Sequence, residues 1–111
     1  MYQPIILPHF HRQIKDLAKK YRHLKAAVIR TLSNFDKREA VPLGGNVYKV
    51  RVRSADIAKG KSKSFRLLIL VIGSDGYLVP IAIYFKGDQE SLSKKEINTH
   101  LETILLELKR Q

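Results

Sequence analysis

Residues 65–85 read FRLLILVIGSDGYLVPIAIYF, and they predict two neighbouring strands of a β-sheet. An unbroken apolar run follows Arg66, which is typical of a strand covered on both faces in the middle of a sheet. Residues 73–76 contain an Asp-Gly pair, which tolerates the positive φ angles of tight hairpins. Residues 77–85 are then predicted to form the returning strand. Pro80 lacks an amide donor and predicts an edge position or a bulge nearby.

A further strand is predicted upstream of this hairpin. Residues 42–46 are turn formers, and residues 47–53 then alternate in character with a period of two. We expect one face of this strand to point to the core and the other to be cationic. The core face would carry Tyr48, Val50 and Val52, and the other face Val47, Lys49, Arg51 and Arg53.

Helical patterns flank the strands on both sides. Apolar residues recur in steps of three and four from residue 10 onward to residue 35, and a single rod of about 26 residues would span about 39 Å, so we predict a break at residues 21–23. Ser93 and Glu96 form a capping box that begins the last helix. The order of elements predicts an α+β fold, with two N-terminal helices and a C-terminal helix around a small, mainly antiparallel sheet. The length suits a single domain over residues 1–111.

The charge of the chain points to an anionic partner. Lys and Arg number 21 against 10 Asp and Glu, which gives a net charge of +11, so nucleic acid, an anionic membrane or an acidic protein is expected among the partners. The absence of cysteine excludes disulfides, thiolate metal sites and cysteine nucleophiles. The apolar start at residues 5–7 is too short for a signal peptide or a membrane span, so we expect a cytoplasmic protein without a membrane partner.

Strand parity gathers the cations on one face of the predicted sheet. On the last strand, Tyr84 and Lys86 would share a face with Leu78 and Ala82, and Ile81 would lie on the other face. No Asp or Glu is interleaved on the cationic face, and a polyanion would relieve the repulsion between neighbouring strands. An ordinary solvated outer face is the alternative interpretation. The face would be lined by Lys49, Arg51, Arg53, Arg66, Tyr84 and Lys86.

The loop at residues 54–64 adds Lys59, Lys61 and Lys63. It is interpreted either as a basic loop that closes over RNA or as a solvated connection between two strands.

Metal chemistry is not predicted. The four histidines, at positions 9, 11, 23 and 100, have no spacing that suits a metal set and are expected on the surface. Asp56, Asp75 and Asp88 are scattered, which disfavours a two-metal nuclease. RNA can be cut without a metal or cofactor because its 2′-hydroxyl is the nucleophile. The protein must then supply a base, cations and a proton donor, and neighbouring cations make lysine a better base and tyrosine easier to ionise.

The sequence resembles the RelE/ParE toxin superfamily, and most closely its RelE-like and HigB-like members. The resemblance covers most of the chain and rests on residues 48–53, 64–66 and 83–88, followed by the capped helix. It implies a toxin of a type II toxin–antitoxin system that cleaves messenger RNA on the ribosome and leaves a cyclic phosphate. It also implies a cognate antitoxin that wraps the toxin and blocks its cleft, with operator DNA contacted only through that antitoxin.

The resemblance also implies roles for individual residues. Lys49 and Arg51 match a basic pair used as base and for phosphate binding, and Arg66 matches an arginine that stabilises the transition state. Tyr84 and Lys86 fall where such toxins carry catalytic or stacking side chains. The base is left open among Lys49, Lys59 and Lys61, with Arg53 and Lys63 expected to bind RNA.

Two other functions fit the same sequence. A ParE-like toxin would share the fold but poison DNA gyrase, although a dense basic cleft with Tyr84 favours RNA cleavage. A non-catalytic RNA- or ribosome-binding module would make the same phosphate contacts.

Overall fold

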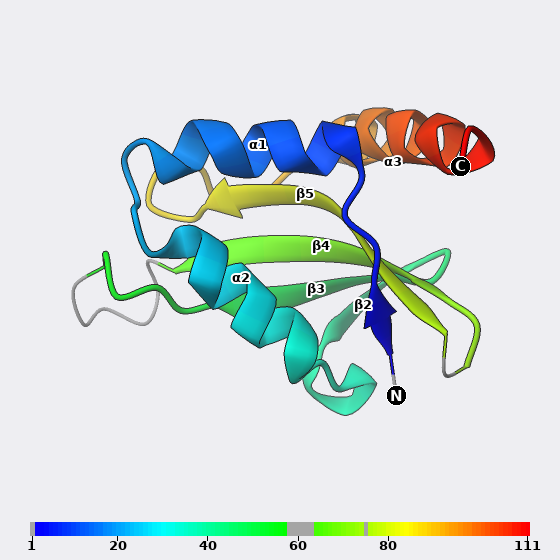
Figure 1. Cartoon of the computed structure of the whole chain (residues 1–111), viewed down its shortest axis with the longest axis horizontal. Coiled ribbons are helices and arrows are strands. Elements are labelled where there is room, and N and C mark those ends of the chain that lie inside the picture. The colour runs from blue at the N-terminus through cyan, green and yellow to red at the C-terminus, as the bar shows by residue number, and fades with distance from the viewer. Residues whose placement is uncertain (1, 58–63, 75) are drawn as a thin grey trace.

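The computed structural model describes residues 2–57, 64–74 and 76–111. The predicted α+β class is confirmed: two N-terminal helices and one C-terminal helix pack on a mainly antiparallel sheet (Figure 1). The elements are β1 (Gln3–Pro4), α1 (Pro8–Ala18), α2 (Leu24–Ser33), the 3-10 helix η1 (Lys37–Glu39), β2 (Val41–Gly44), β3 (Val47–Val52), β4 (Phe65–Ile72), β5 (Tyr77–Phe85) and α3 (Lys94–Lys109).

The sheet has the strand order β1-β5-β4-β3-β2, in which only β1 is parallel to its neighbour. The predicted strands β3, β4 and β5 form its centre. The expectation of a turn over residues 42–46 was wrong at its start, because Val41–Gly44 pairs with β3 as an edge strand. The turn itself is confined to Gly45 and Asn46, which both have positive φ. Every residue of β2 is exposed, so no burial pattern marked it in the sequence.

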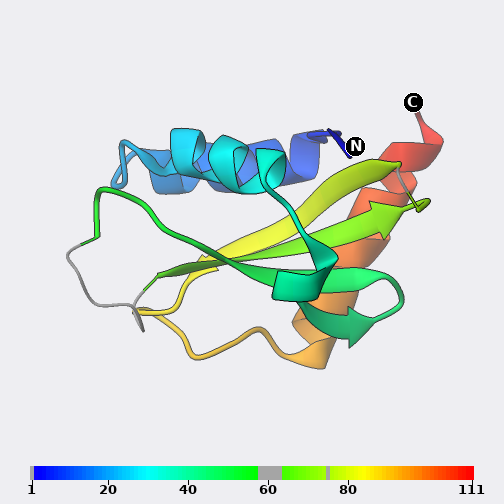
Figure 2. The same cartoon turned by 90° about the horizontal axis from the view of Figure 1, so that it is seen from below.

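Helices cover both faces of the sheet. Figure 2 shows α1 and α2 on one face and α3 on the other. Phe10, Leu24 and Phe65 belong to the core between the sheet and the first two helices. Leu68, Val79 and Ile104 belong to the core beneath α3. The central strand β4 is buried from Phe65 to Val71, as the apolar run predicts.

A bulge in β5 changes which side chains share a face. Leu68 pairs with Ala82 but Ile69 pairs with Pro80, so Ile81 is the extra residue. The bulge predicted near Pro80 is therefore confirmed. The parity prediction was wrong for Leu78 and Ile81, because the extra residue shifts the alternation: Leu78 joins the core of α1 and α2, and Ile81 joins that of α3.

The helix boundaries agree with the local signals in the sequence. The predicted break lies between α1, which ends at Ala18, and α2, which begins at Leu24. Ser93 caps α3, since its Oγ accepts from the Glu96 N–H at 3.1 Å and Glu96 accepts from the Ser93 N–H at 2.9 Å. Within the described ranges, no helix has both the length and the apolar character needed to cross a membrane.

Candidate nucleic-acid interface

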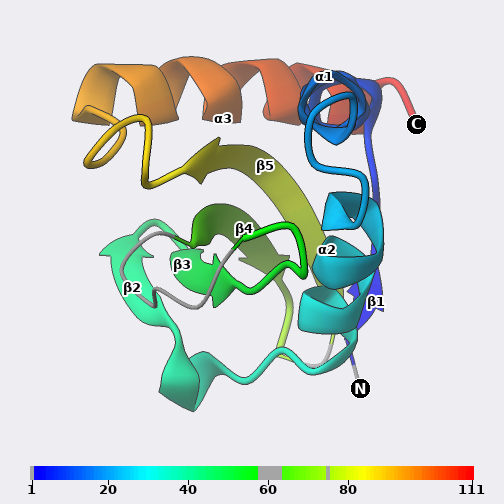
Figure 3. The same cartoon turned by 90° about the vertical axis from the view of Figure 1, so that its left-hand side faces the viewer.

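Three side chains lie side by side across the sheet at one end of its α3 face. Arg51 on β3 is paired with Arg66 on β4, and Arg66 is paired with Tyr84 on β5. Directly opposite residues place their Cβ atoms about 4.5–5.5 Å apart, so the three side chains start from neighbouring positions on one face of the sheet. We call Arg51, Arg66 and Tyr84 the basic row. Figure 3 looks at the end of the molecule where β3 and β5 finish and β4 begins.

Arg66 is the buried cation of the basic row, with 8% of its surface exposed. Its Nη1 donates to the Ser64 carbonyl at 3.3 Å and to the Ser64 hydroxyl, while Nε and Nη2 bind no described residue. No carboxylate of the described residues lies within ion-pair distance of Arg66 or Arg51. Burial and the charge of Arg51 lower the pKa of Arg66, although a guanidinium stays charged at neutral pH. The site thus holds a desolvated positive charge with unused donors.

Tyr84 differs from the expectation that its neighbours make it easier to ionise. Only 6% of its surface is exposed, and no described residue hydrogen-bonds to its hydroxyl. Burial raises the pKa of Tyr84 above its ordinary value, and the opposing effect of Arg66 is smaller. The phenol therefore stays protonated at neutral pH and suits a proton donor or a stacking surface better than a base.

The other described cations flank the basic row. Lys49 lies one pair further along β3, opposite Leu68, and Arg53 follows the end of that strand. Lys86 extends the ladder beyond β5, since its N–H donates to the Ser64 carbonyl at 3.1 Å. Lys59, Lys61 and Lys63 lie outside the described residues.

Glu90 is a neighbour that strand parity did not reveal. Its Oε1 lies 3.9 Å from the Lys86 Nζ, and its charge raises the pKa of both Arg66 and Tyr84. Glu90 lies in the loop after β5. The alternation of side chains along strands gives no information on residues in loops, so it could not reveal Glu90. The expectation that the cationic face is free of carboxylates is therefore wrong at this end of the row.

A groove of about 800 Å³ joins the row to the other face of the sheet. It runs from Arg66 and Arg51, past the open edge of β3, to residues 30–34 of α2. Its volume lies in the range of sites that bind sizeable ligands. The groove is lined by Arg30, Thr31, Asn34, Phe35, Asp36, Glu39, Val41, Lys49, Val50, Arg51, Arg53 and Arg66.

The chain resembles solved structures over almost its whole length. It is similar to a double arginine-to-alanine mutant of the E. coli toxin RelE in the free state, at 17% sequence identity and a TM-score of 0.48. The alignment covers 98% of this chain and 96% of that chain. No protein-family model matches the sequence, and no curated protein matches it.

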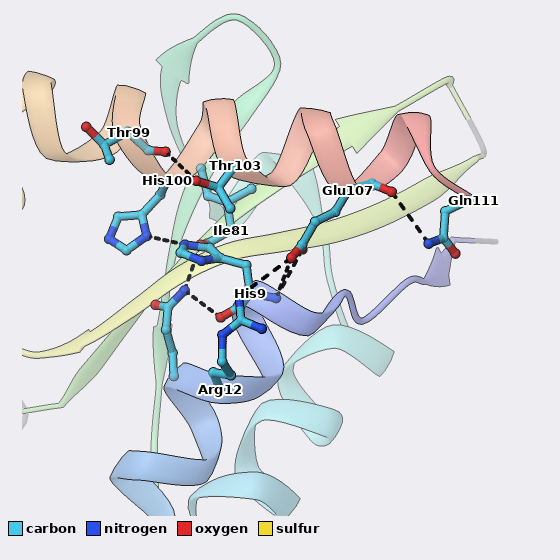
Figure 4. Close-up of polar contacts among 9 residues, drawn as sticks. His9, Arg12, Ile81, Thr99, His100, Thr103, Glu107 and Gln111 are labelled. Carbon is cyan, nitrogen blue, oxygen red and sulfur yellow. Dashed lines mark hydrogen bonds and ion pairs between the residues drawn. The ribbon is translucent and has the colours of Figure 1, made fainter.

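A second polar group, which we call the helix cluster, joins α1, α3 and β5 (Figure 4). It consists of His9, Arg12, Gln13, His100 and Glu107. His9 Nε2 lies 2.8 Å from His100 Nδ1, and the Glu107 carboxylate accepts from the His9 backbone N–H at 3.0 Å and 3.1 Å. Since α1 has no side-chain cap of its own, Glu107 performs that function from α3.

Gln13 of the helix cluster completes the backbone pairing at the β5 bulge. Its Nε2 donates to the Ile81 carbonyl at 3.1 Å, and its Oε1 accepts from the Ile83 N–H at 3.1 Å. The expectation that His9 and His100 are surface histidines was wrong, because each is partly buried between the two helices. Ninety-one positions separate them in the sequence, so no local pattern could reveal this contact.

A third histidine, His23, contacts an aspartate near the beginning of α2. His23, which is exposed, hydrogen-bonds through Nδ1 to Asp56 at 2.8 Å, and Asp56 also accepts from the Ser54 hydroxyl at 2.9 Å. This contact joins the beginning of α2 to the segment after β3. Among the residues that the structure describes, no three histidine or acidic side chains are grouped closely enough to hold a metal ion.

Proposed function

We propose that the protein is the toxin of a type II toxin–antitoxin system and acts as a metal-independent endoribonuclease on messenger RNA, inhibiting translation and growth. The observation that carries this proposal is the basic row, in which Arg66 lies buried beside Arg51 and Tyr84 without a carboxylate partner among the described residues. A buried cation that keeps unused donors destabilises the free protein and is compensated when an anion binds. The resemblance to RelE-like and HigB-like toxins points to messenger RNA on the ribosome as that anion.

The proposed reaction needs only groups of the protein and the RNA. The ribose 2′-oxygen attacks the adjacent phosphorus, its proton passes to a base, and the bond to the 5′-oxygen of the next nucleotide breaks. The products are a 2′,3′-cyclic phosphate and a free 5′-hydroxyl. Arg51 and Arg66 would bind the phosphate oxygens as charge develops on them. Tyr84, which stays protonated at neutral pH, would donate to the leaving oxygen or stack on a base.

We propose that a lysine is the base that takes the proton of the 2′-hydroxyl. Lys49 is the candidate within the described residues, and it lies on the same face as the basic row. Lys59 and Lys61 stay proposals from the sequence, as do Arg53, Lys63 and Lys86 as RNA contacts. A cognate antitoxin, cytoplasmic location and contact with operator DNA through the antitoxin complete the proposal.

Mapping of RNA ends in cells tests this function directly. The protein would be expressed from a repressed promoter, and RNA 5′ ends would be sequenced before and after growth stops. New internal ends in messenger RNA, at positions occupied by ribosomes, are the expected result. Growth arrest with intact transcripts would refute the nuclease, and double-strand breaks in DNA would instead support a gyrase poison.

Purified components separate the chemical step from the cellular response. Purified protein would be incubated with programmed ribosomes in magnesium buffer and with free messenger RNA in EDTA. The expected product carries a cyclic phosphate, and a transcript with a single 2′-deoxy substitution at the cleavage position should resist cutting there. If RNA is bound but neither substrate is cut, a non-catalytic RNA-binding module is the better description.

A further inference from the structure

The centre of the groove is a stretch of β3 that pairs with β4 on one side and, among the described residues, with no strand on the other side. Pairing with β2 stops at Val41 and Lys49, because the chain before Val41 turns away into η1. The Val71 N–H donates to the Asn46 carbonyl at 2.9 Å, which fixes the alternation of the β3–β4 ladder. By that alternation, the backbone N–H and C=O of Arg51 point away from β4 and toward this open edge.

Cations continue past the open edge to α2. Arg53 follows Arg51 along the chain, and Arg30 of α2 reaches across to donate to the Arg53 carbonyl at 3.5 Å. Arg30 and Arg53 are both exposed, and neither has a carboxylate within ion-pair distance among the described residues. The positive charge of the basic row therefore extends around the edge of the sheet.

The acidic side chains of the groove do little to offset this charge. Of the residues that the structure describes, two carboxylates line the groove against five cations. Asp36 is occupied, because the Arg38 Nη2 donates to it at 2.9 Å and the Arg38 Nε at 3.1 Å. These hydrogen bonds hold the pKa of Asp36 below its ordinary value. Glu39 is exposed on η1 and is the other acidic residue lining the groove.

We infer that the groove binds one single strand of RNA, which leaves the basic row, passes around the open edge of β3 and reaches α2. In this arrangement Arg53 and Arg30 bind the phosphates next to the one held by Arg51 and Arg66. The Arg51 N–H is a further donor for a phosphate oxygen, and Val41, which is exposed, offers an apolar surface to a base or sugar. The inference rests on the proposed function, since it takes RNA as the ligand of the row.

The observations favour RNA over an acidic peptide as the occupant. RNA carries a charge at every nucleotide, which matches a groove whose lining includes cations from Arg66 to Arg30. Four of the five cations are arginines, and the planar guanidinium suits phosphate oxygens. The groove is also continuous with the row at which cleavage is proposed, so one ligand can occupy both.

Binding of short, uncleavable RNA tests this path. The ligands are 2′-O-methyl oligonucleotides of two and of six nucleotides, and the readout is fluorescence anisotropy over a series of salt concentrations. Arg30→Gln should weaken binding of the hexanucleotide about 3- to 10-fold and leave the dinucleotide unaffected. It should also make the dependence of log K on log salt shallower by about 0.7, the value expected for one phosphate contact on a single strand.

Arg22→Gln is the matched control, because Arg22 is an exposed arginine in the turn before α2 and does not line the groove. Thermal unfolding of both variants checks that each is folded. Equal losses in the two variants would mean that only the overall charge matters, and this would overturn the inference. Tighter binding of an oligoglutamate peptide than of the hexanucleotide, lost in Arg30→Gln, would also overturn it and assign the groove to an acidic protein.

Cleavage assays distinguish failure of the inference from failure of the proposed function. If the wild-type protein cuts RNA and Arg30→Gln changes neither KM nor hexanucleotide binding, the function stands and the path is wrong. If the wild-type protein never cuts RNA but Arg30→Gln weakens the hexanucleotide selectively, the path stands and the nuclease proposal is wrong.

Discussion

The basic row and the helix cluster differ in how their polar groups are compensated. In the helix cluster, His9 faces His100, Glu107 caps α1, and Gln13 binds two backbone groups of β5. In the basic row, two arginines face each other without a carboxylate in ion-pair range among the described residues. Compensated groups hold elements together, whereas uncompensated charge is retained at the expense of stability. The comparison therefore separates a structural group from a candidate binding site.

Removal of the Arg66 charge should have the largest effect, which is a loss of RNA cleavage without a loss of stability. Arg66→Gln should lower the rate of RNA cleavage by about 10²- to 10³-fold, since a preorganised donor to the reacting phosphate is lost. Its free energy of unfolding should be unchanged or higher, because a desolvated charge has been removed. Single-turnover cleavage and urea unfolding measure the two quantities.

Two variants control this experiment. Arg66→Lys keeps the charge but loses the planar fork, so it should retain intermediate activity. Arg110→Gln removes an exposed arginine at the end of α3 and should leave cleavage unchanged. Full activity in Arg66→Gln would remove Arg66 from the site.

Gln13 should show the opposite pattern. Gln13→Leu leaves the Ile81 carbonyl and the Ile83 N–H without their side-chain partner at the bulge, which should lower the free energy of unfolding by about 2 kcal/mol. Cleavage measured well below the unfolding midpoint should not change. Lys15→Leu, an exposed position on the same helix, is the control. A lost activity in folded Gln13→Leu would contradict the separation of the two groups.

The histidine pair makes the helix cluster sensitive to pH. Burial lowers the pKa of His9, with Arg12 adding to this and Glu107 opposing it. Burial and His9 lower the pKa of His100, with Glu96 opposing. A histidine whose pKa is lower in the folded state takes up protons more readily when unfolded, so stability is present above about pH 6.5 and is lost as the pH falls below it.

The effect should appear between about pH 7.5 and about pH 5.5. Over this range the free energy of unfolding should fall more in the wild type than in the double variant His9→Asn/His100→Asn. His11→Asn, at an exposed position, should behave like the wild type. Parallel pH profiles for the wild type and the double variant would show that the pair carries no such linkage.

Local signals in the sequence predicted most of the fold. The capping box at Ser93 and the hairpin over residues 65–85 depend on neighbours in the chain, and both agree with the structure. The edge strand β2 was missed because it buries nothing. The bulge near Pro80 was expected. The faces on which Leu78 and Ile81 lie depend on which residue of β5 is left unpaired, and only the register of β4 with β5 reveals that residue.

The candidate site was predictable only in part. The alternation of side chains correctly placed Arg51, Arg66 and Tyr84 on one face. The strands β3 and β4 are regular at their paired positions, and the bulge in β5 precedes Tyr84 and so does not change its pairing with Arg66. Glu90 and Arg30 could not be found in this way, since a loop and a helix bring them to the row and the groove. The state of Tyr84 was misjudged, because its burial outweighs the charge of its neighbour.

The smallest predicted effect concerns the repulsion within the basic row. Arg51→Gln removes one of two like charges on directly opposite residues. The free energy of unfolding should therefore rise by roughly a few tenths of 1 kcal/mol at low salt. The gain should shrink in 0.5 M salt, which screens an exposed charge. Arg53→Gln is the matched control, because it removes the same charge from a position beyond the end of β3. Urea midpoints at two salt concentrations measure the difference, and a loss of stability in Arg51→Gln would mean that Arg51 contributes packing or hydrogen bonds that outweigh the repulsion.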